Sequence, residues 1–325
     1  MRGDAPEPAG TSVTAILLTR NRKGVLEYVL DRLMEQHVDE VIVVDNGSDD
    51  GTGEMVRGRG DGVRLIEPGR NTGIEGRNLA AREAAGDLLL MLDDDAYPQP
   101  GAIHRLLEAF RLDPRLAVAG GLVRDVDEDH QVVLVDEVGT FDWFIRAGHE
   151  GEIPEEGLRT WLFPEGASMV RRDAFLEVGG FFEPFFFTVS EIDLAARLIA
   201  AGWEIRYVPG AVFNHMKPQG HASDARWALQ YRVRNQIWHF WMRYPPSVAA
   251  RRISGYLLFD LVECTYRRVP GVWLRGVLEA WRRRDEVRSA RHPLPRRALR
   301  RAEMNRGRLH LRLLRAQLRR KLARD

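Results

Sequence analysis

The chain has 325 residues, of which 44% are hydrophobic and 29% are charged, so it is long enough for one large domain or two smaller ones. This length and composition exclude a peptide, a disordered linker and a disulfide-stabilised mini-protein. The single cysteine, Cys264, cannot form an internal disulfide, and no Cys/His cluster has the spacing of a zinc site. A reducing cytoplasm is therefore the simplest compartment to expect.

The net charge of +1 conceals an asymmetry along the chain. Residues 1–225 contain 22 Lys and Arg against 40 Asp and Glu, whereas residues 226–325 contain 26 against 7. The two parts carry opposite charges of −18 and +19, which predicts different partners for each. We expect a disordered lead over 1–12, an α/β domain over 13–225 and a helical, arginine-rich region over 226–325.

Short β-rich runs alternate with helical patterns through the first part of the chain, which predicts a Rossmann-like, mostly parallel central sheet with helices on both faces. No stretch reaches the ~18 apolar residues that span a bilayer, because Asp260 and Glu263 interrupt the best candidate at 253–266. The expected strands are 13–18, 41–45, 63–66, 87–92, 116–123, 166–170 and 205–208, and the expected helices are 24–36, 74–85, 101–112 and 190–201, with one more near Thr52.

Polar side chains follow each of the first four strands. In an open parallel sheet the ligand lies in the crevice outside the carboxyl ends of the strands, so these side chains should converge on one edge. They are Thr19, Arg20 and Asn21 after the first strand, Asp45, Asn46 and Gly47 after the second, Asn71 and Gly73 after the third, and Asp93, Asp94 and Asp95 after the fourth.

Three consecutive carboxylates at the end of a buried strand repel one another unless a cation is present. Asp93 and Asp95 leave an extended backbone on the same side, which suits coordination of Mg²⁺ or Mn²⁺ together with a diphosphate. The alternative is an acidic turn before Pro98, since Asp is common in turns. The apolar run before the triplet and the other polar clusters on the same edge favour the metal site.

Two neighbouring segments suit a nucleotide. Asp45, fixed at a strand end, can accept the imide N–H of a pyrimidine base. Taken alone, the string VVDNGSDDGT around it indicates only a polar turn. The segment 69–78 presents Asn71 and Arg77 at a helix start, a suitable setting for ribose or phosphate. Its spacing is neither that of a Walker loop nor that of a GxGxxG fingerprint, which disfavours ATPase and nicotinamide chemistry.

The order of these motifs resembles that of the family 2 glycosyltransferases of GT-A fold, especially their rhamnosyltransferase-like and galactofuranosyltransferase-like branch. The resemblance covers residues 13–220 and implies an inverting, divalent-metal-dependent transfer of a sugar from a nucleoside diphosphate donor. The motifs are TRNR, VVDNGSDDGT, NTGIEGRN, LDDDAYP, FPEGASMVRRDAFLEVGGFFEPFF and SEIDLAARLIAAGWEIRYVPGAVFNH.

On this resemblance, Asp45 matches the base-binding aspartate, which favours a UDP- or dTDP-sugar. Asp93 and Asp95 match the Asp-x-Asp motif, with Asp95 the favoured direct ligand of Mn²⁺ or Mg²⁺, and His215 matches a histidine that completes the metal site in some members. The donor nucleotide site implied in this way comprises Thr19, Arg20, Asn21, Asp45, Asn46, Asn71, Arg77, Asp93 and Asp94.

The catalytic base should come from SEIDL, residues 190–194, where many relatives have Glu-Asp-x-Asp-Leu. In that register Glu191 replaces the aspartate base and Ser190 replaces the preceding glutamate. We expect Glu191 to be the base, and Asp193 to be either a residue that orients it or the alternative base. The structural alternative is that both are carboxylates favoured by a helix N-terminus.

The acceptor site implied by the resemblance comprises Trp161, Gly166 and Ala167, beside the aromatic stretch 181–187. Aromatic faces suit a carbohydrate, a lipid-linked glycan or the apolar part of a natural product, although about half of these phenylalanines should lie in the core. The chain lacks the Gln-x-x-Arg-Trp motif of polymerising synthases, so we expect non-processive transfer.

The basic region after Arg226 has an amphipathic aromatic pattern up to Pro245 and a leucine stripe over 311–322. Three interpretations stay open: contact with an anionic membrane surface, which would place the protein at the inner face of the cell membrane; packing on the acidic domain; and pairing of two chains as a homodimer. Nucleic-acid binding is disfavoured because no helix-turn-helix, RNA-stacking motif or zinc finger accompanies the charge.

Two other functions compete with sugar transfer. A nucleotidyltransferase also uses paired carboxylates and Mg²⁺ on an α/β sheet, but TRNRKG after the first strand supplies little glycine for a triphosphate loop. A non-catalytic binding protein acting through its basic tail is the second alternative. Ser190, where an acid is usual, is the feature that favours it.

Overall fold

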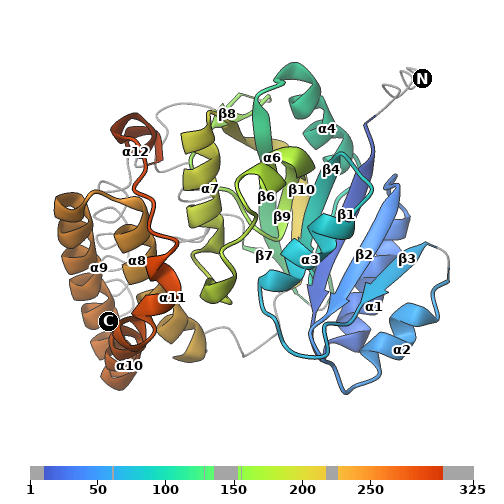
Figure 1. Cartoon of the computed structure of the whole chain (residues 1–325). Coiled ribbons are helices and arrows are strands. Elements are labelled where there is room, and N and C mark those ends of the chain that lie inside the picture. Colours follow the sequence, from blue (N-terminus) through green and yellow to red (C-terminus); the bar gives the residue numbers. More distant parts are fainter. Residues whose placement is uncertain are drawn as a thin grey trace.

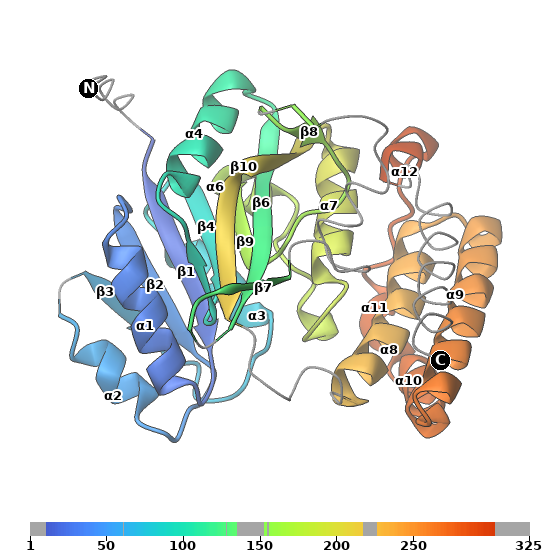
Figure 2. The same ribbon diagram turned by 180° about the vertical axis from the view of Figure 1, so that it is seen from behind.

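The computed structural model describes residues 11–60, 62–127, 129–134, 153–154, 156–216 and 226–302. These form a mixed sheet covered by helices on both faces, with a helical layer packed against one side (Figures 1 and 2). The strands are β1 (Val13–Thr19), β2 (Glu40–Asp45), β3 (Val63–Ile66), β4 (Leu88–Asp93), β5 (Ala96–Pro98), β6 (Leu116–Val126), β7 (Val132–Leu134), β8 (Leu158–Arg159), β9 (Ala167–Arg171) and β10 (Glu204–Met216). The helices are α1 (Lys23–Met34), α2 (Thr52–Arg57), α3 (Glu75–Glu83), α4 (Ala102–Leu112), α6 (Arg172–Glu177), the 3₁₀ turn η1 (Glu183–Phe185), α7 (Ser190–Ala201), α8 (Arg226–Arg243), α9 (Pro246–Tyr266), α10 (Pro270–Arg282), α11 (Arg284–Arg288) and α12 (Arg296–Ala302).

The sheet has the strand order β3-β2-β1-β4-β9-β6-β10-β5. The first four strands are parallel, as are β6 and β10, whereas β9 runs antiparallel between β4 and β6, and β5 runs antiparallel to β10. The α/β sheet with helices is therefore confirmed. It is parallel only in part, because the antiparallel strand β9 lies between β4 and β6.

Both faces of the central strands are buried, which explains their continuous apolar runs. On one face Leu30 of α1 and Leu106 of α4 pack against Leu17 and Leu90. On the other face α3, α6 and α7 cover the sheet, and Phe175 lies in that second core. Figure 2 shows α1 and α4 in front of the sheet, whereas α3, α6 and α7 lie in front in Figure 1. Because these strands are buried on both faces, only the residues at their ends reach solvent. A site on this sheet should therefore lie at the strand ends.

The last strand is longer than its sequence pattern suggests. The sequence pattern predicts a strand over 205–208, but β10 continues through Pro209 and Gly210 to Met216. Its pairing with β6 shifts register between Val208 and Val212, so an irregularity absorbs the two strand-breaking residues. The continuation places the end of β10 beside β5, the strand that follows the carboxyl end of β4.

The helical region after residue 226 packs directly on the α/β domain. Helix α8 contacts α7, and α9 and α10 in turn contact α8 (Figures 1 and 2). The aromatic helix expected up to Pro245 is confirmed as α8. The leucine stripe at 311–322, and the homodimer predicted from it, lie outside the described residues, as does the predicted domain boundary at 225. Among the described residues no helix is long and apolar enough to cross a membrane.

A buried carboxylate joins α7 to α8. Asp193 has no exposed surface and accepts hydrogen bonds from Arg197 Nε at 2.8 Å and from Arg243 Nε at 2.7 Å, while His239 Nδ1 lies 3.2 Å away. Burial alone would raise the pKa of Asp193, but the charge of Arg197, the hydrogen bond with His239 and the charge of Arg243 outweigh it and hold the pKa well below its usual range. The basic helix is therefore anchored by an acid of the first domain.

We expect Asp193→Asn to lower the free energy of unfolding by about 3–5 kcal/mol at pH 7, because two buried guanidinium groups lose their counter-charge. A depressed carboxyl pKa contributes stability above the ordinary value of about 3.9, and that contribution disappears as the pH falls. The difference between the two proteins should therefore shrink below about pH 4.

Urea unfolding followed at several pH values measures this difference. Asp285→Asn is the matched control, because Asp285 and its partner Arg288 are both largely exposed, so that it should cost less than about 1 kcal/mol. Equal effects of the two substitutions would contradict the anchoring role of Asp193.

Candidate active site

The predicted polar clusters meet at the carboxyl edge of the parallel strands. Thr19 pairs with Asp45 across β1 and β2, and Leu18 pairs with Asp93 across β1 and β4. A cleft of about 580 Å³ opens at this edge. The predicted donor residues that line it are Thr19, Arg20, Asn46, Asn71, Arg77, Asp93 and Asp94, and the other lining residues are Leu18, Arg22, Gly73, Ile74, Glu165, Phe186, Phe187, Thr188, Ser190 and Trp227.

Hydrogen bonds fix the end of β2 and the segment before α3. Asp45 is buried and accepts hydrogen bonds from the backbone N–H and the hydroxyl of Ser48, at 2.9 and 2.6 Å. The amide oxygen of Asn46 accepts hydrogen bonds from the N–H and hydroxyl of Thr72, at 3.1 and 2.6 Å. Asn21 instead braces the loop after β2, since its side-chain oxygen accepts the N–H of Asp49 at 2.8 Å. Asp45 and Asn46 are thus held rigidly beside the cleft.

An arginine of the first βα loop pairs with two of the three carboxylates. Asp94 accepts hydrogen bonds from the Thr19 hydroxyl at 2.8 Å and from Arg22 at 2.7 Å, and the same nitrogen of Arg22 lies 2.6 Å from Asp95. Burial raises the pKa of Asp94 to about 6, the charge of Arg22 opposes that rise and the charge of Asp95 adds to it. Arg22 therefore supplies a positive charge that Asp94 and Asp95 share.

His215 lies next to Asp95 because β10 pairs with β5, the strand that directly follows the triplet. Its Nε2 is 3.5 Å from Asp95 Oδ1, and its Nδ1 is 2.8 Å from Asp125 Oδ1. Burial lowers the pKa of His215, but the hydrogen bond to Asp125 and the charge of Asp95 raise it more, so the net shift is upward. An imidazole oriented by a carboxylate on its far nitrogen is a common arrangement for a metal ligand.

These side chains supply only part of the ligands that a divalent ion needs. Asp95 and His215 present an oxygen and a nitrogen near each other, whereas Asp93 Oδ1 is bound by Arg77 at 2.6 Å. Within the described ranges no three His, Cys, Asp or Glu side chains are grouped so that they could hold a metal on their own. A divalent ion at this place would need further oxygen ligands from a bound diphosphate or from water.

A buried arginine connects Asp93 to a second acid. Arg77 is 1% exposed, bonds Asp93, and places its Nε 3.4 Å from Glu165 Oε1. Gly166 follows Glu165 and lies so close to Asp93 that a Cβ there would be 2.0 Å from Asp93 Oδ2. Only glycine permits this approach of the loop before β9 to the end of β4. Within the described residues, Nη1 of Arg77 is buried and has no hydrogen-bond acceptor, and Nε lies near the Glu165 carboxylate alone.

The predicted base residues lie at the start of α7. Ser190, the first residue of the helix, lines the cleft, and Glu191 follows it in the first turn and is half-buried. Asp193 lies in the interior between α7 and α8. Of the three predicted acceptor residues, Gly166 contacts Asp93, Ala167 is buried in the sheet core and Trp161 packs against the opposite core, and none of the three is among the cleft-lining residues.

An aromatic wall forms the other side of the cleft. Phe186 stacks on Tyr231 of α8 with ring centroids 5.3 Å apart, and Phe187 lies 4.7 Å from Trp227. Phe186, Thr188 and Val189 have positive φ angles of 64°, 55° and 67°, which non-glycine residues rarely adopt. Side chains of α8 hold this strained segment in place.

Buried polar side chains of α8 form hydrogen bonds with the backbone of this segment. Arg234 donates hydrogen bonds to the carbonyls of Pro184 and Phe185, at 2.9 and 2.8 Å. Asn235 donates to the carbonyls of Phe185, Phe187 and Thr188, at 3.0, 2.6 and 3.0 Å. The helical region therefore shapes the cleft as well as packing beside it.

Comparison with known proteins identifies this arrangement. The family model described as Glycosyl transferase family 2 matches residues 14–179, about half of the chain. The chain belongs to glycosyl transferase family 2. This assignment confirms the predicted family and enzyme class and decides against a nucleotidyltransferase and a non-catalytic binding protein.

Two relatives of this family 2 glycosyltransferase are named rhamnosyltransferases. It is 32% identical, over 57% of its length and 68% of the relative, to the N-acetylglucosaminyl-diphospho-decaprenol L-rhamnosyltransferase of Mycobacterium tuberculosis. It is 27% identical, over 62% of its length and 66% of the relative, to the O-antigen chain rhamnosyltransferase RfbN of Salmonella typhimurium. Both fall within the rhamnosyltransferase-like branch that the motif order predicted.

Solved structures confirm the GT-A fold. The mannosyltransferase PcManGT of Pyrobaculum calidifontis, solved with GDP-Man and Mn²⁺, has a TM-score of 0.57 at 19% identity, over 85% of this chain and 89% of that one. GalNAc-T7, solved with UDP, GalNAc and Mn²⁺, has a TM-score of 0.57 at 15% identity, over 73% of this chain and 48% of that one. At these identities the likeness concerns the fold alone.

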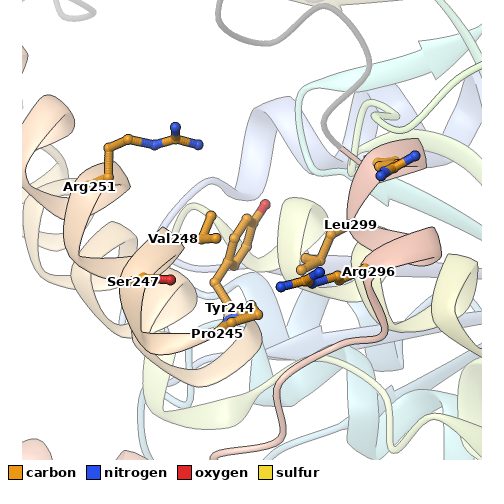
Figure 3. Close-up of a pocket in the computed structure, with 8 residues that line it drawn as sticks. Tyr244, Pro245, Ser247, Val248, Arg251, Arg296 and Leu299 are labelled. Atoms are coloured by element: carbon orange, nitrogen blue, oxygen red, sulfur yellow. The ribbon is translucent and has the colours of Figure 1, made fainter.

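A second cavity of the glycosyltransferase lies away from the strand ends. It measures about 340 Å³ and lies between the first turn of α9 and α12, where Figure 3 shows Arg251 and Arg296 on either side of Tyr244. Its lining includes three arginines and no carboxylate, so it offers neither a base nor a metal ligand. The cleft at the strand ends is therefore the candidate active site.

Proposed function

We propose that this glycosyltransferase transfers a single sugar from a UDP- or dTDP-sugar to a hydroxyl group of a lipid-linked glycan, with inversion at the anomeric carbon. The observation that carries the proposal is the cleft that Asn46, Asp93 and the start of α7 line together, with Asp95 and His215 3.5 Å apart next to the carboxylates of β4. Relatives named for rhamnosyl transfer make dTDP-rhamnose the first donor to test.

The donor lies, on this proposal, along the carboxyl ends of β1, β2 and β4. Asp45 accepts the imide N–H of the base, and Asn46, Asn71 and Arg77 face the ribose and diphosphate. Asp95 and His215 would hold Mn²⁺ or Mg²⁺, with Asp93 beside them. The ion would neutralise charge that builds up on the leaving diphosphate.

Glu191 is the proposed base. Its carboxylate takes the proton of the acceptor hydroxyl while that oxygen bonds to the anomeric carbon and the bond to the diphosphate breaks. One displacement of this kind inverts the configuration. Asp193 is a poorer candidate, because both of its oxygens are engaged by arginines in the interior and a base with a strongly depressed pKa accepts a proton weakly.

We expect UDP or dTDP to bind in the presence of Mn²⁺ and Asp95→Ala to weaken that binding by about 100-fold, because the variant removes a charged metal ligand. Calorimetric titration of UDP, dTDP, GDP and ATP, each with and without Mn²⁺, measures this effect. Asp285→Ala, on the exposed surface of α11, is the matched control and should bind as the wild type does. A folded wild type that binds none of the four nucleotides would contradict the proposed donor site.

We expect Glu191→Gln to lower kcat by at least about 100-fold, the usual contribution of a general base, and to leave the affinity for the nucleoside diphosphate within about threefold. The readout is release of UDP or dTDP from a panel of their sugars, with farnesyl-diphospho-N-acetylglucosamine as acceptor. Glu286→Gln, in the same short helix as Asp285, is the exposed control. An unchanged kcat in Glu191→Gln would remove Glu191 from the mechanism.

An exposed apolar surface on α9 and α10 favours an acceptor that is anchored in a membrane. We propose that this surface contacts an anionic membrane. Leu258, Val262 and Tyr266 of α9 are 54–67% exposed, and Leu274, Leu278 and Trp281 of α10 are 38–64% exposed; these six side chains form the α9–α10 face. Such a concentration of exposed large side chains is unusual for a surface that meets only water.

The α9–α10 face points away from the body of the protein. The opposite sides of both helices pack on α8, where Asp260 bonds Arg232 and Gly276 abuts Val233. The exposed Arg275 and Arg282 lie on α10 beside the face, and Arg284 lies 4.8 Å from the Trp281 ring. Apolar and aromatic side chains mixed with arginine suit the headgroup region of an anionic bilayer.

We expect the protein to cosediment with vesicles that contain phosphatidylglycerol and the double variant Leu258→Asp/Trp281→Ala to bind them at least about tenfold more weakly, because two large apolar groups no longer insert. Leu112→Asp is the matched control, since Leu112 is 66% exposed but lies on α4. Equal weakening by the control, or no binding of the wild type at low salt, would contradict the membrane contact.

A further inference from the structure

The first residue of α7 is held by an acid from another part of the chain. The Ser190 hydroxyl donates a hydrogen bond of 2.6 Å to Glu165 Oε2, across 25 residues of sequence. Ser190 occupies the place where the Glu-Asp-x-Asp-Leu pattern has its first acid. Position 190 therefore has no carboxylate of its own, but the carboxylate of Glu165 contacts it.

We infer that Glu165 is a positioning residue that supplies, from the loop before β9, the carboxylate that the chain lacks at position 190. The inference rests on the proposed function, which it deepens by assigning a second acid to the active site. Glu165 acts through its neighbours: one of its oxygens faces the donor side of the cleft and the other faces the base side.

On the donor side, Glu165 shares Arg77 with Asp93. Arg77 Nε lies 3.4 Å from Glu165 Oε1, and Arg77 Nη2 lies 2.6 Å from Asp93 Oδ1. Because Arg77 is buried, the carboxylates of Asp93 and Glu165 are both needed to offset its charge and to fix the direction of its guanidinium group. A neutral side chain at 165 would leave Arg77 paired with Asp93 alone.

On the base side, Glu165 fixes the first turn of α7. Val189, which precedes Ser190, has a φ of 67°, so the helix starts from a strained residue. The hydrogen bond from Ser190 joins this start to the loop before β9, where Gly166 abuts Asp93 and Ala167 pairs with Leu92 in the sheet. Glu191 is the next residue, so the position of the base depends on this contact.

The exchange of the two side chains tests the inference. We expect Glu165→Gln, which keeps the size but loses the charge, to lower kcat by at least about tenfold while KM for the donor stays within about threefold, the loss expected when a charged group leaves a hydrogen bond. Glu165→Ser should lose as much. The double variant Glu165→Ser/Ser190→Glu should recover kcat to within about threefold of the wild type, because the carboxylate returns to the same place from α7.

Thermal unfolding and calorimetric binding of UDP and dTDP accompany each variant, so that loss of folding is separated from loss of positioning. Glu286→Gln is the exposed control. A wild type that releases nucleotide from none of the sugars would contradict the proposed function and this inference with it. An active wild type that Glu165→Gln leaves unchanged, or a folded double variant as inactive as Glu165→Ser, would overturn this inference alone.

Discussion

Three adjacent carboxylates at the end of β4 are the constraint on which the active site depends. They stand at the end of a strand that is buried on both faces. Water screens the buried Asp94 and Asp95 poorly, so neighbouring side chains must offset their charges, whereas the Asp93 side chain is half exposed. Arg22 offsets Asp94 and Asp95, Arg77 offsets Asp93, and His215 lies next to Asp95. The βα loops, the bulged end of β10 and the loop before β9 take up their positions around this charge.

The helical region completes the site that this cluster begins. Asp193 anchors α8 on α7, and from that anchor Arg234 and Asn235 hold the backbone of the aromatic segment. Packing of the basic helices on the acidic domain, one of the interpretations left open by the charge pattern, is thus an arrangement of specific buried bonds. Arg275 and Arg282 are instead exposed on α10, one of the outer helices.

The sequence predicted what depends on local pattern and on motif order. Apolar runs located β1, β2 and β4, and the polar residues after them located the cleft. It did not predict the roles of Arg22 and Glu165, because their partners Asp94 and Ser190 lie 72 and 25 residues away and only the folded chain brings them together. The position of Arg22 in the loop that follows the first strand was a usable signal, whereas nothing local distinguishes Glu165 from a solvent-exposed acid. The length of β10 was missed because Pro209 and Gly210 end an apolar pattern without ending the strand.

The hydrogen bonds from Arg234 and Asn235 to carbonyls about fifty residues earlier also bear on how such enzymes diversify. The part of the chain that matches the family model ends at residue 179, before the aromatic segment and before α8. Recombination between relatives at that point would keep β1–β4 together but separate Glu165 from Ser190 and Asp95 from His215. A crossover between the segment and α8 would join a strained loop to a foreign helix. The aromatic wall of the cleft should therefore be inherited, and transplanted in engineered chimaeras, as one block that runs from η1 through α8.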